Sequence, residues 1–560
     1  MTMSNKQAGL VGYWPLQGDS QDYSGHDNHA VNYGVDLERG VFDGKSSYLA
    51  VAPSPSLSFA GEEFTLAAWV STGAEIEGVF GDIMSKFDAN ARKGFSLSLK
   101  SSAGGYNSQG SDRHLHFGID DGKVSAWEPC GRPSPYSNYV SNSLTVFDGN
   151  LYAGTLDAEQ AENWCHVYRY QGEQAWFDCG RVGNLRTKGV GPMIVHNRKL
   201  YAGTWNYDWT RVFDEPLDYC HVYEYAGDQE WIDRGQPGFN LRLIGMASYK
   251  GQLYVAGDDR TGGSFKIFVL EDGDHWRQCA TIPGDFLPHA LGVYHGTLYI
   301  GTGSIHAYDG VQCAYVGTPL NCTQVHSLET YQGELYAGTW PEGKLFQYKG
   351  GETWEDCGRL GDSIELNALA VYNGKLYAGS IPRAEVYRYE GGQQWTRLAR
   401  FYSPADWIPE LPVVASKQGV NEWTRVTSLT VFKGRLFASI ASCTGSILDA
   451  PCDVRGQVFS MQAGHCITDD RDLGVGRKHI AAVRAGSTLA LYINGELAVT
   501  STAATHDAYD ITNREPLKIG FGTEDFFSGA IQEVRVYDRA LATEQVRQLY
   551  DESKAKGLDH

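Results

Sequence analysis

The sequence lacks the segments that mark a membrane or exported protein. No stretch approaches the roughly 20 consecutive apolar residues that a bilayer-spanning helix needs. The N-terminus, MTMSNKQAGLVGYWPL, has no basic segment followed by an apolar run. We therefore expect no membrane insertion and no signal peptide, so the protein is either cytoplasmic or a mature secreted form without its signal.

Basic residues are also scarce. Lys and Arg number 47 against 67 Asp and Glu, which gives a formal net charge of −20 at pH 7. Proteins that bind nucleic acid present a basic surface to the phosphates, so this composition argues against a nucleic-acid partner. An acidic surface of this size is enough to keep a large protein soluble.

Paired cysteines and compact catalytic motifs are absent as well. The 11 cysteines are odd in number and form no CxxC pair, which argues against a disulfide framework. Cys130, Cys179 and Cys357 share one repeat position and are expected to be small buried residues, whereas Cys443 and Cys452 could form a bridge in an oxidising environment. No P-loop, dinucleotide fingerprint or HExxH motif occurs, and the sequence requires no cofactor.

Glycine, in contrast, is abundant. The chain has 66 Gly but only 19 Pro, and 12% of its residues are aromatic, a composition that favours short strands and tight turns. A length of 560 residues exceeds what one hydrophobic core holds, so we expect two or three domains.

A sequence repeat that encodes two strands occurs seven times. In each copy two β-rich runs flank a Gly-containing turn, which is typical of a hairpin. The copies are SLTVFDGNLYAGT at Ser143, MIVHNRKLYAGT at Met193, MASYKGQLYVAG at Met246, ALGVYHGTLYIGT at Ala290, SLETYQGELYAGT at Ser327, ALAVYNGKLYAGS at Ala368 and SLTVFKGRLFAS at Ser428. In most copies, a third run such as HVYRYQG and a fourth such as WFDCGR follow. Four strands per unit, with a period of roughly forty to fifty residues, predict a seven-bladed β-propeller. The Tyr and Trp placement resembles kelch-like propellers.

The last copy lacks its fourth run. A matching segment, SAWEPCGRP at residues 125–133, lies before the first copy and has no blade of its own. We predict that this strand is the outer strand of blade seven, because joining the two ends of the propeller leaves no open sheet edge.

The two ends of the chain together resemble one further family. LVGYWPLQGDSQDYSGHDNHAVNYGV at Leu10, FTLAAWVST at Phe64, KHIAAVRAGSTLALYINGELAV at Lys478 and LKIGFGTEDFFSGAIQEVRVYDRALATEQVRQLY at Leu517 resemble the laminin-G/concanavalin-A-like jelly-roll family. This resemblance implies a discontinuous β-sandwich formed by residues 1–122 and 465–560. The propeller, residues 123–464, would then be inserted into one of its loops, giving an all-β fold. The resemblance is compatible with a structural calcium ion in the sandwich, although the sequence does not identify a set of ligands for it.

Aligning the repeats predicts which residues meet at one end of the propeller. His289 and His326 occupy the same position at the start of the innermost strand in neighbouring blades, as does Asn367. Arg242, Glu365 and Arg425 lie two positions earlier, and the loops after the second strands bring Trp205, Tyr207, Asp208, Arg260, Trp340 and Arg383. Each histidine could instead plug the ring through hydrogen bonds, and the arginines could form ordinary ion pairs with nearby carboxylates.

These residue types are suited to binding and cleaving carbohydrate. Histidine serves as a general base near neutral pH, arginine binds carboxylates, and aromatic faces pack against sugar rings. The combination resembles propeller-fold polysaccharide lyases, which implies His289, His326 and Tyr207 as candidate catalytic residues acting on a uronic-acid-containing glycan. The others would bind an acidic or neutral glycan. Two alternatives stay open: a glycosidase, including a rhamnosidase-like enzyme, using carboxylates such as Asp208 and Glu365, and a non-catalytic glycan-binding or scaffold protein.

Overall fold

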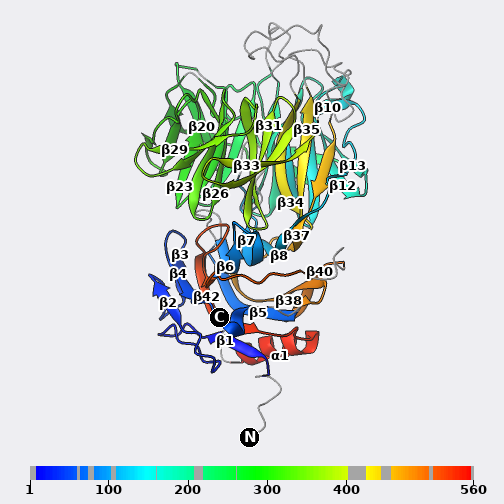
Figure 1. Ribbon diagram of the computed structural model, residues 1–560. Coiled ribbons are helices and arrows are strands. Elements are labelled where there is room, and N and C mark those ends of the chain that lie inside the picture. Colours follow the sequence, from blue (N-terminus) through cyan, green and yellow to red (C-terminus); the bar gives the residue numbers. More distant parts are fainter. Residues whose placement is uncertain are drawn as a thin grey trace.

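The protein consists of a propeller stacked on a β-sandwich (Figure 1). The computed structural model describes residues 8–59, 63–73, 81–101, 109–158, 161–206, 218–259, 261–284, 286–401, 424–442, 456–502 and 509–555. Strands dominate this part of the chain, whose only α-helix is α1 (Thr543–Lys554). The prediction of an all-β chain that combines a propeller with a concanavalin-A-like sandwich is confirmed.

The sandwich has two seven-stranded sheets, and both contain strands from the two ends of the chain. The first sheet is ordered β1 (Leu10–Trp14), β42 (Ser528–Tyr537), β5 (Glu63–Thr72), β38 (Gly476–Ala485), β39 (Thr488–Ile493) and β40 (Glu496–Thr500), with β3 (Val41–Asp43) beside β42. The second is ordered β2 (Ala30–Tyr33), β4 (Tyr48–Val51), β41 (Leu517–Ile519), β6 (Gly81–Asp88), β7 (Lys93–Lys100), β8 (His114–Val124) and β37 (Ala463–Asp469). Alternating apolar residues fill the space between the sheets, for example Phe95, Leu97 and Leu99 of β7.

Antiparallel four-stranded groups form the propeller. Four of these groups are separate sheets. The first two are β18 (Leu243–Tyr249), β19 (Gln252–Gly257), β20 (Phe265–Leu270) and β21 (Trp276–Ile282), followed by β22 (Ala290–Tyr294), β23 (Thr297–Gly301), β24 (Ile305–Tyr308) and β25 (Cys313–Tyr315). The next two are β26 (Gln324–Tyr331), β27 (Glu334–Trp340), β28 (Lys344–Tyr348) and β29 (Trp354–Arg359), followed by β30 (Glu365–Tyr372), β31 (Lys375–Ile381), β32 (Glu385–Gly391) and β33 (Gln394–Arg400).

Single backbone bridges join the remaining strands into one twelve-stranded sheet. Its members are β10 (Ser137–Phe147), β11 (Asn150–Ala158), β12 (His166–Gly172) and β13 (Ala175–Arg181); β14 (Gly189–His196), β15 (Lys199–Trp205), β16 (Val222–Gly227) and β17 (Glu230–Asp233); and β34 (Thr424–Phe432), β35 (Arg435–Ser442), β36 (Val458–Met461) and β9 (Glu128–Pro129).

Strand β9 lies where the repeat comparison expects it, beside β36. Phe459 pairs with Pro129, and the Cys130 amide donates to the Val458 carbonyl at 2.8 Å. The indole of Trp176 in β13 donates to the Cys130 carbonyl, just as Trp231 of β17 donates to Cys179 of β13. Residues 125–131 therefore take the position of an outer strand next to β10–β13. The predicted domain limits at 122/123 and 464/465 fall inside β8 and β37, which pair with each other, and stay a prediction.

The sandwich covers one face of the propeller, which we call the junction. This face carries the turns between the first and second strands of the groups. The Asn373 side chain, in the turn after β30, donates to the carbonyls of Ile119 at 3.1 Å and Ala463 at 2.7 Å, and the Gly333 amide donates to Glu524. The inner strands start at the opposite face, which we call the mouth and which points away from the sandwich (Figure 1).

The buried carboxyl of Glu524 at the junction makes the unfolding free energy of the protein depend on pH. Burial, reinforced by Asp82 and opposed by the Lys100 ammonium, raises the pKa of Glu524 from 4.5 to about 7. A carboxyl with a raised folded-state pKa contributes stability below its unfolded pKa and loses it as the pH rises through the folded value. Glu524→Gln lacks this contribution. We expect the unfolding free energy of the wild type, relative to the variant, to fall by on the order of 3 kcal/mol between about pH 5 and about pH 8.

Urea unfolding of both proteins at the two pH values measures this difference. Histidines that are buried in a neutral state also change stability in this window, but they are common to both proteins and cancel in the comparison. Parallel pH profiles for the wild type and Glu524→Gln would contradict the assignment.

Candidate functional site at the propeller mouth

Irregularities in the inner strands aim side chains into the mouth. The register between β26 and β27 shifts between Val325 and Ser327, so His326 is an extra, bulged residue. The same shift occurs around Asn367 in β30 and Thr427 in β34. A bulge bends the strand and redirects the side chain, so these residues leave the regular alternation of their strands.

His289 and His326 form a stacked pair. Their ring centroids are 4.4 Å apart with an interplanar angle of 30°, and the side chains come from neighbouring groups, β22–β25 and β26–β29. His289 is 9% exposed and His326 4%. The repeat comparison predicted this proximity from sequence position alone.

A carboxyl and an amide fix the orientation of His326. Its Nε2 lies 2.8 Å from Gln324 Oε1, and because an amide oxygen only accepts, Nε2 carries the ring proton. The other nitrogen, Nδ1, lies 3.3 Å from Glu365 Oε1. A carboxylate this close to Nδ1 can stabilise the imidazolium form of His326.

Two arginines act electrostatically on the histidine pair. Arg425, 6% exposed, lies with its guanidinium carbon 5.7 Å from the ring centroid of Tyr139, and its charge acts on His326. Arg242 acts on His289 in the same way and is held by Asp258, whose Oδ2 lies 3.2 Å from Arg242 Nε. Each of the stacked rings is thus under the influence of a positive charge.

Both histidines are neutral at physiological pH. Burial, aided by the Arg425 charge, lowers the pKa of His326 to about 3. Burial, the neighbouring His326 and the Arg242 charge hold the pKa of His289 well below its ordinary value. A neutral imidazole can accept a proton, and an anionic group brought next to it raises its pKa.

Other predicted residues have different surroundings. Trp205 is 5% exposed and packs with Tyr139 and Leu156, and its indole donates to the Leu243 carbonyl, so it offers no open face for sugar stacking. Asn367 is fully buried and donates to the Val426 carbonyl at 3.0 Å, which makes it part of the wall. Trp340 is half-buried at the end of β27.

Arg383 lies beside this group of residues. It is bridged through its backbone to Thr424, next to Arg425. Its guanidinium is 3.7 Å from the exposed carboxylate of Asp362, the kind of surface ion pair that was its alternative interpretation. Tyr207, Asp208 and Arg260 lie outside the described residues, as do Cys443 and Cys452.

Two participants are not among the predicted site residues. Gln324 occupies the same repeat position as Glu365 and Arg425, and this shared position was a usable signal. Tyr139, 4% exposed, was missed because β10 shifts register between Val140 and Leu144, and an alignment of the repeats by residue count does not follow such a shift.

Metal ligands do not converge in the described part of the chain, where no group of three or more His, Cys, Asp or Glu side chains is arranged to hold an ion. The calcium ion stays a prediction. Across the same residues, no helix is both long and apolar enough to cross a membrane.

Comparisons with known proteins find one family model and several distantly similar structures. Residues 412–547 match a family model described as the concanavalin A-like lectin/glucanases superfamily. The match covers less than half of the chain, and it includes β34–β36 as well as the C-terminal strands of the sandwich. No curated protein sequence matches the chain.

Among solved structures, virginiamycin B lyase from Staphylococcus aureus is similar with a TM-score of 0.42 and 8% identity, over 61% of this chain and 99% of that one. The WD40 propeller domain of Doa1 gives 0.39 and 9%, over 60% and 97%. Trypanosoma rangeli sialidase in complex with the inhibitor DANA gives 0.31 and 12%, over 78% and 98%. Similarity at this level carries no argument about activity.

Proposed function

We propose that the protein is a carbohydrate-active enzyme that cleaves a uronic-acid-containing polysaccharide or oligosaccharide by β-elimination at the propeller mouth. The observation that carries the proposal is the stacked, neutral His289–His326 pair, on which the charges of Arg242 and Arg425 act. The match of residues 412–547 to the concanavalin A-like lectin/glucanases superfamily supports a carbohydrate as the substrate class.

The proposed reaction uses the charges of the mouth. Arg425 binds the uronate carboxylate and lowers the acidity barrier at C5. His326 takes the C5 proton, the C4–C5 double bond forms, and the bond from C4 to the glycosidic oxygen breaks. The departing oxygen then takes a proton from the imidazolium of His326, whose ring stacks on that of His289. Negative charge brought by the substrate raises the histidine pKa toward the range in which a base works efficiently.

One geometric feature favours a glycoside hydrolase as the second candidate. Glu365 is 4% exposed and lies 3.3 Å from an imidazole nitrogen, so a buried carboxyl and a histidine could together activate water. Asp258 is less suited to this role, because it accepts hydrogen bonds from Arg242 and from the amide of Leu241.

A panel of acidic and neutral polysaccharides tests the proposal. Each is incubated with the protein while the ultraviolet absorbance of unsaturated uronate and the number of reducing ends are followed together. Reducing ends that appear with the absorbance support β-elimination, and reducing ends without it support hydrolysis. Binding without either signal would reject both enzymatic functions in favour of a glycan-binding or scaffold protein.

Replacing Arg425 by methionine should separate acidic from neutral substrates. Loss of a charge-assisted hydrogen bond to the uronate is expected to lower kcat/KM about 10-fold to 100-fold. A carboxyl-reduced form of the same polysaccharide lacks the anionic partner and should react poorly with both proteins. An Arg425→Met enzyme with wild-type kcat/KM on the acidic polymer would remove Arg425 from carboxylate binding.

A further inference from the structure

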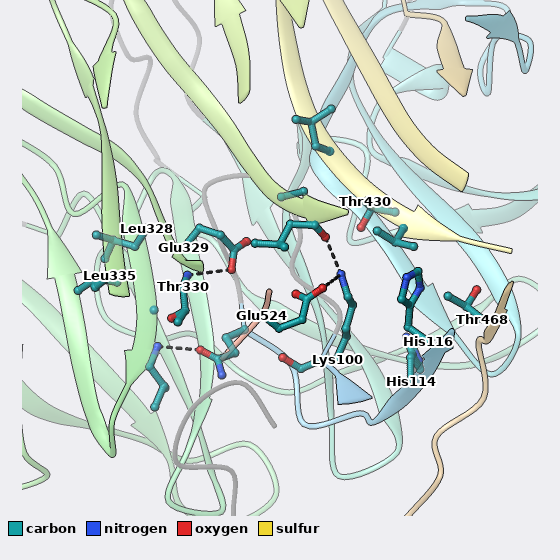
Figure 2. A pocket seen from close by; sticks show the side chains of 18 of the residues that line it. Lys100, His114, His116, Leu328, Glu329, Thr330, Leu335, Thr430, Thr468 and Glu524 are labelled. Atoms are coloured by element: carbon teal, nitrogen blue, oxygen red, sulfur yellow. Dashed lines mark hydrogen bonds and ion pairs between the residues drawn. The ribbon is translucent and has the colours of Figure 1, made fainter. Parts of the chain in front are cut away.

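A second polar site lies at the junction, on the far side of the propeller from the mouth. A cavity of about 80 Å³ lies between the inner strands of the propeller and strands β7, β8 and β37 of the sandwich. Figure 2 shows Lys100 and Glu524 between Leu328 and His116. Pockets of this kind, mostly apolar with a few convergent polar groups, are the usual form of a small-molecule site.

The propeller supplies the apolar wall. The wall residues come from four successive inner strands of the propeller. They are Leu291 and Val293 of β22, Leu328 of β26, Ala370 and Val371 of β30, and Leu429 and Val431 of β34.

The sandwich supplies the charged groups. Lys100 Nζ lies 2.6 Å from Glu524 Oε1 and donates to the Val371 carbonyl, also at 2.6 Å. The two side chains are 11% and 4% exposed. An ammonium has three donors, so one N–H of Lys100 is available to a further acceptor.

Two more side chains line the cavity with unused hydrogen-bonding capacity. His116 is fully buried, and within the described residues neither of its ring nitrogens has a hydrogen-bond partner. Gln109 is 7% exposed; its Oε1 accepts from the Val293 amide at 2.8 Å, while its Nε2 has no acceptor among those same residues. A buried polar group without a partner destabilises the protein, and a ligand that bonds to it would recover that cost.

The cavity can adjust its charge to an incoming anion. Glu524 faces Lys100 of β7, Asp82 of β6, Asp525 of its own loop and Tyr331 of the propeller. With burial as the main cause, its pKa is raised to about 7. Protonation of Glu524 would leave the Lys100 charge uncompensated and open to another carboxylate.

We propose that the junction cavity is a binding site for a small organic acid. Its carboxylate accepts hydrogen bonds from Lys100, Gln109 Nε2 and His116, and its apolar body packs against Leu291, Leu328 and Leu429. This site is independent of the chemistry at the mouth, so either proposal can fail without the other.

Calorimetric titration of the full-length protein with butyrate tests the site. Butyramide and butylammonium have the same apolar body without the negative charge and serve as matched ligands. We expect saturable, one-to-one binding of butyrate at about pH 6, at least tenfold weaker binding of butyramide, and no binding of butylammonium. At about pH 8, butyrate should bind more weakly, because Glu524 is then ionised.

Two lysine variants of β7 and one leucine variant of β22 test where butyrate binds. Lys100→Met is expected to weaken butyrate at least tenfold, whereas Lys93→Met should leave it unchanged, because the Lys93 pair with Asp510 is partly exposed and lies at the other end of β7. Leu291→Phe narrows the cavity without removing a charge and should also weaken binding, which keeps the test valid if Lys100→Met does not fold. Failure of butyrate to saturate the wild-type protein, equal affinity for butyramide, or unchanged affinity in Leu291→Phe would overturn the proposal.

Discussion

Replacing His326 by alanine is expected to lower kcat/KM by roughly 100-fold to 10,000-fold on the acidic polysaccharide that the protein cleaves. This is the usual contribution of a positioned general base. Its Nδ1 lies 3.3 Å from Glu365 Oε1, so a neighbouring side chain could not supply both the imidazole and this contact. His289→Ala should also lower kcat/KM, because it removes the ring that stacks on His326. Initial rates of unsaturated product at several substrate concentrations measure both variants.

His166→Ala is the matched control. His166 also belongs to the propeller, but its Nδ1 lies 3.0 Å from Asp178 between β12 and β13, outside the mouth. It should keep wild-type rates. His326→Gln keeps a polar side chain of similar length and distinguishes loss of the base from loss of packing. Unchanged rates in both His289→Ala and His326→Ala, with melting temperatures like that of the wild type, would remove the pair from the mechanism.

Arg92→Leu is expected to cost about 3–5 kcal/mol of unfolding free energy, as is typical when one partner of a buried ion pair is removed. Arg92 bonds both oxygens of Asp120, with a shortest contact of 2.8 Å, and also the carbonyls of Gly122 and Lys123. The two side chains are 5% and 0% exposed. The pair lies where the chain leaves the sandwich sheet, so its loss should loosen the attachment of the propeller.

Two further variants complete this experiment. Arg39→Leu breaks an exposed ion pair with Asp36 and should change stability by less than about 1 kcal/mol. The double variant Arg92→Leu/Asp120→Leu should recover part of the loss, because no uncompensated charge is left buried. Urea unfolding monitors all three. An Arg92→Leu protein as stable as the Arg39→Leu protein would show that the buried pair does not hold the junction.

The strands of the propeller could be predicted from the sequence because the repeated copies can be aligned with one another. A strand that occurs in several similar copies can be delimited by aligning those copies. The copy that ends after Val458 lacks its outer strand, and residues 125–133 match the sequence of that strand. The sandwich was harder to see, since β8 and β37 are neighbours in space but are separated by the whole propeller in sequence. Only the family resemblance of the two ends joined them.

The site was predicted in part. Repeat alignment brought His289, His326, Glu365 and Arg425 together because they occupy equivalent positions. It could not tell which side chains turn inward: Trp205 is buried by Tyr139 and Leu156, an arrangement that depends on packing between blades. The junction cavity could not be predicted at all, because Lys100 and Glu524 meet only when the sandwich folds and docks on the propeller.

Mass spectrometry of the products formed in water enriched in heavy oxygen separates elimination at the mouth from hydrolysis. Elimination adds no water, so we expect a new non-reducing end that is lighter by one water molecule than the corresponding hydrolysis product. A non-reducing end without this loss of water would rule out elimination and indicate hydrolysis.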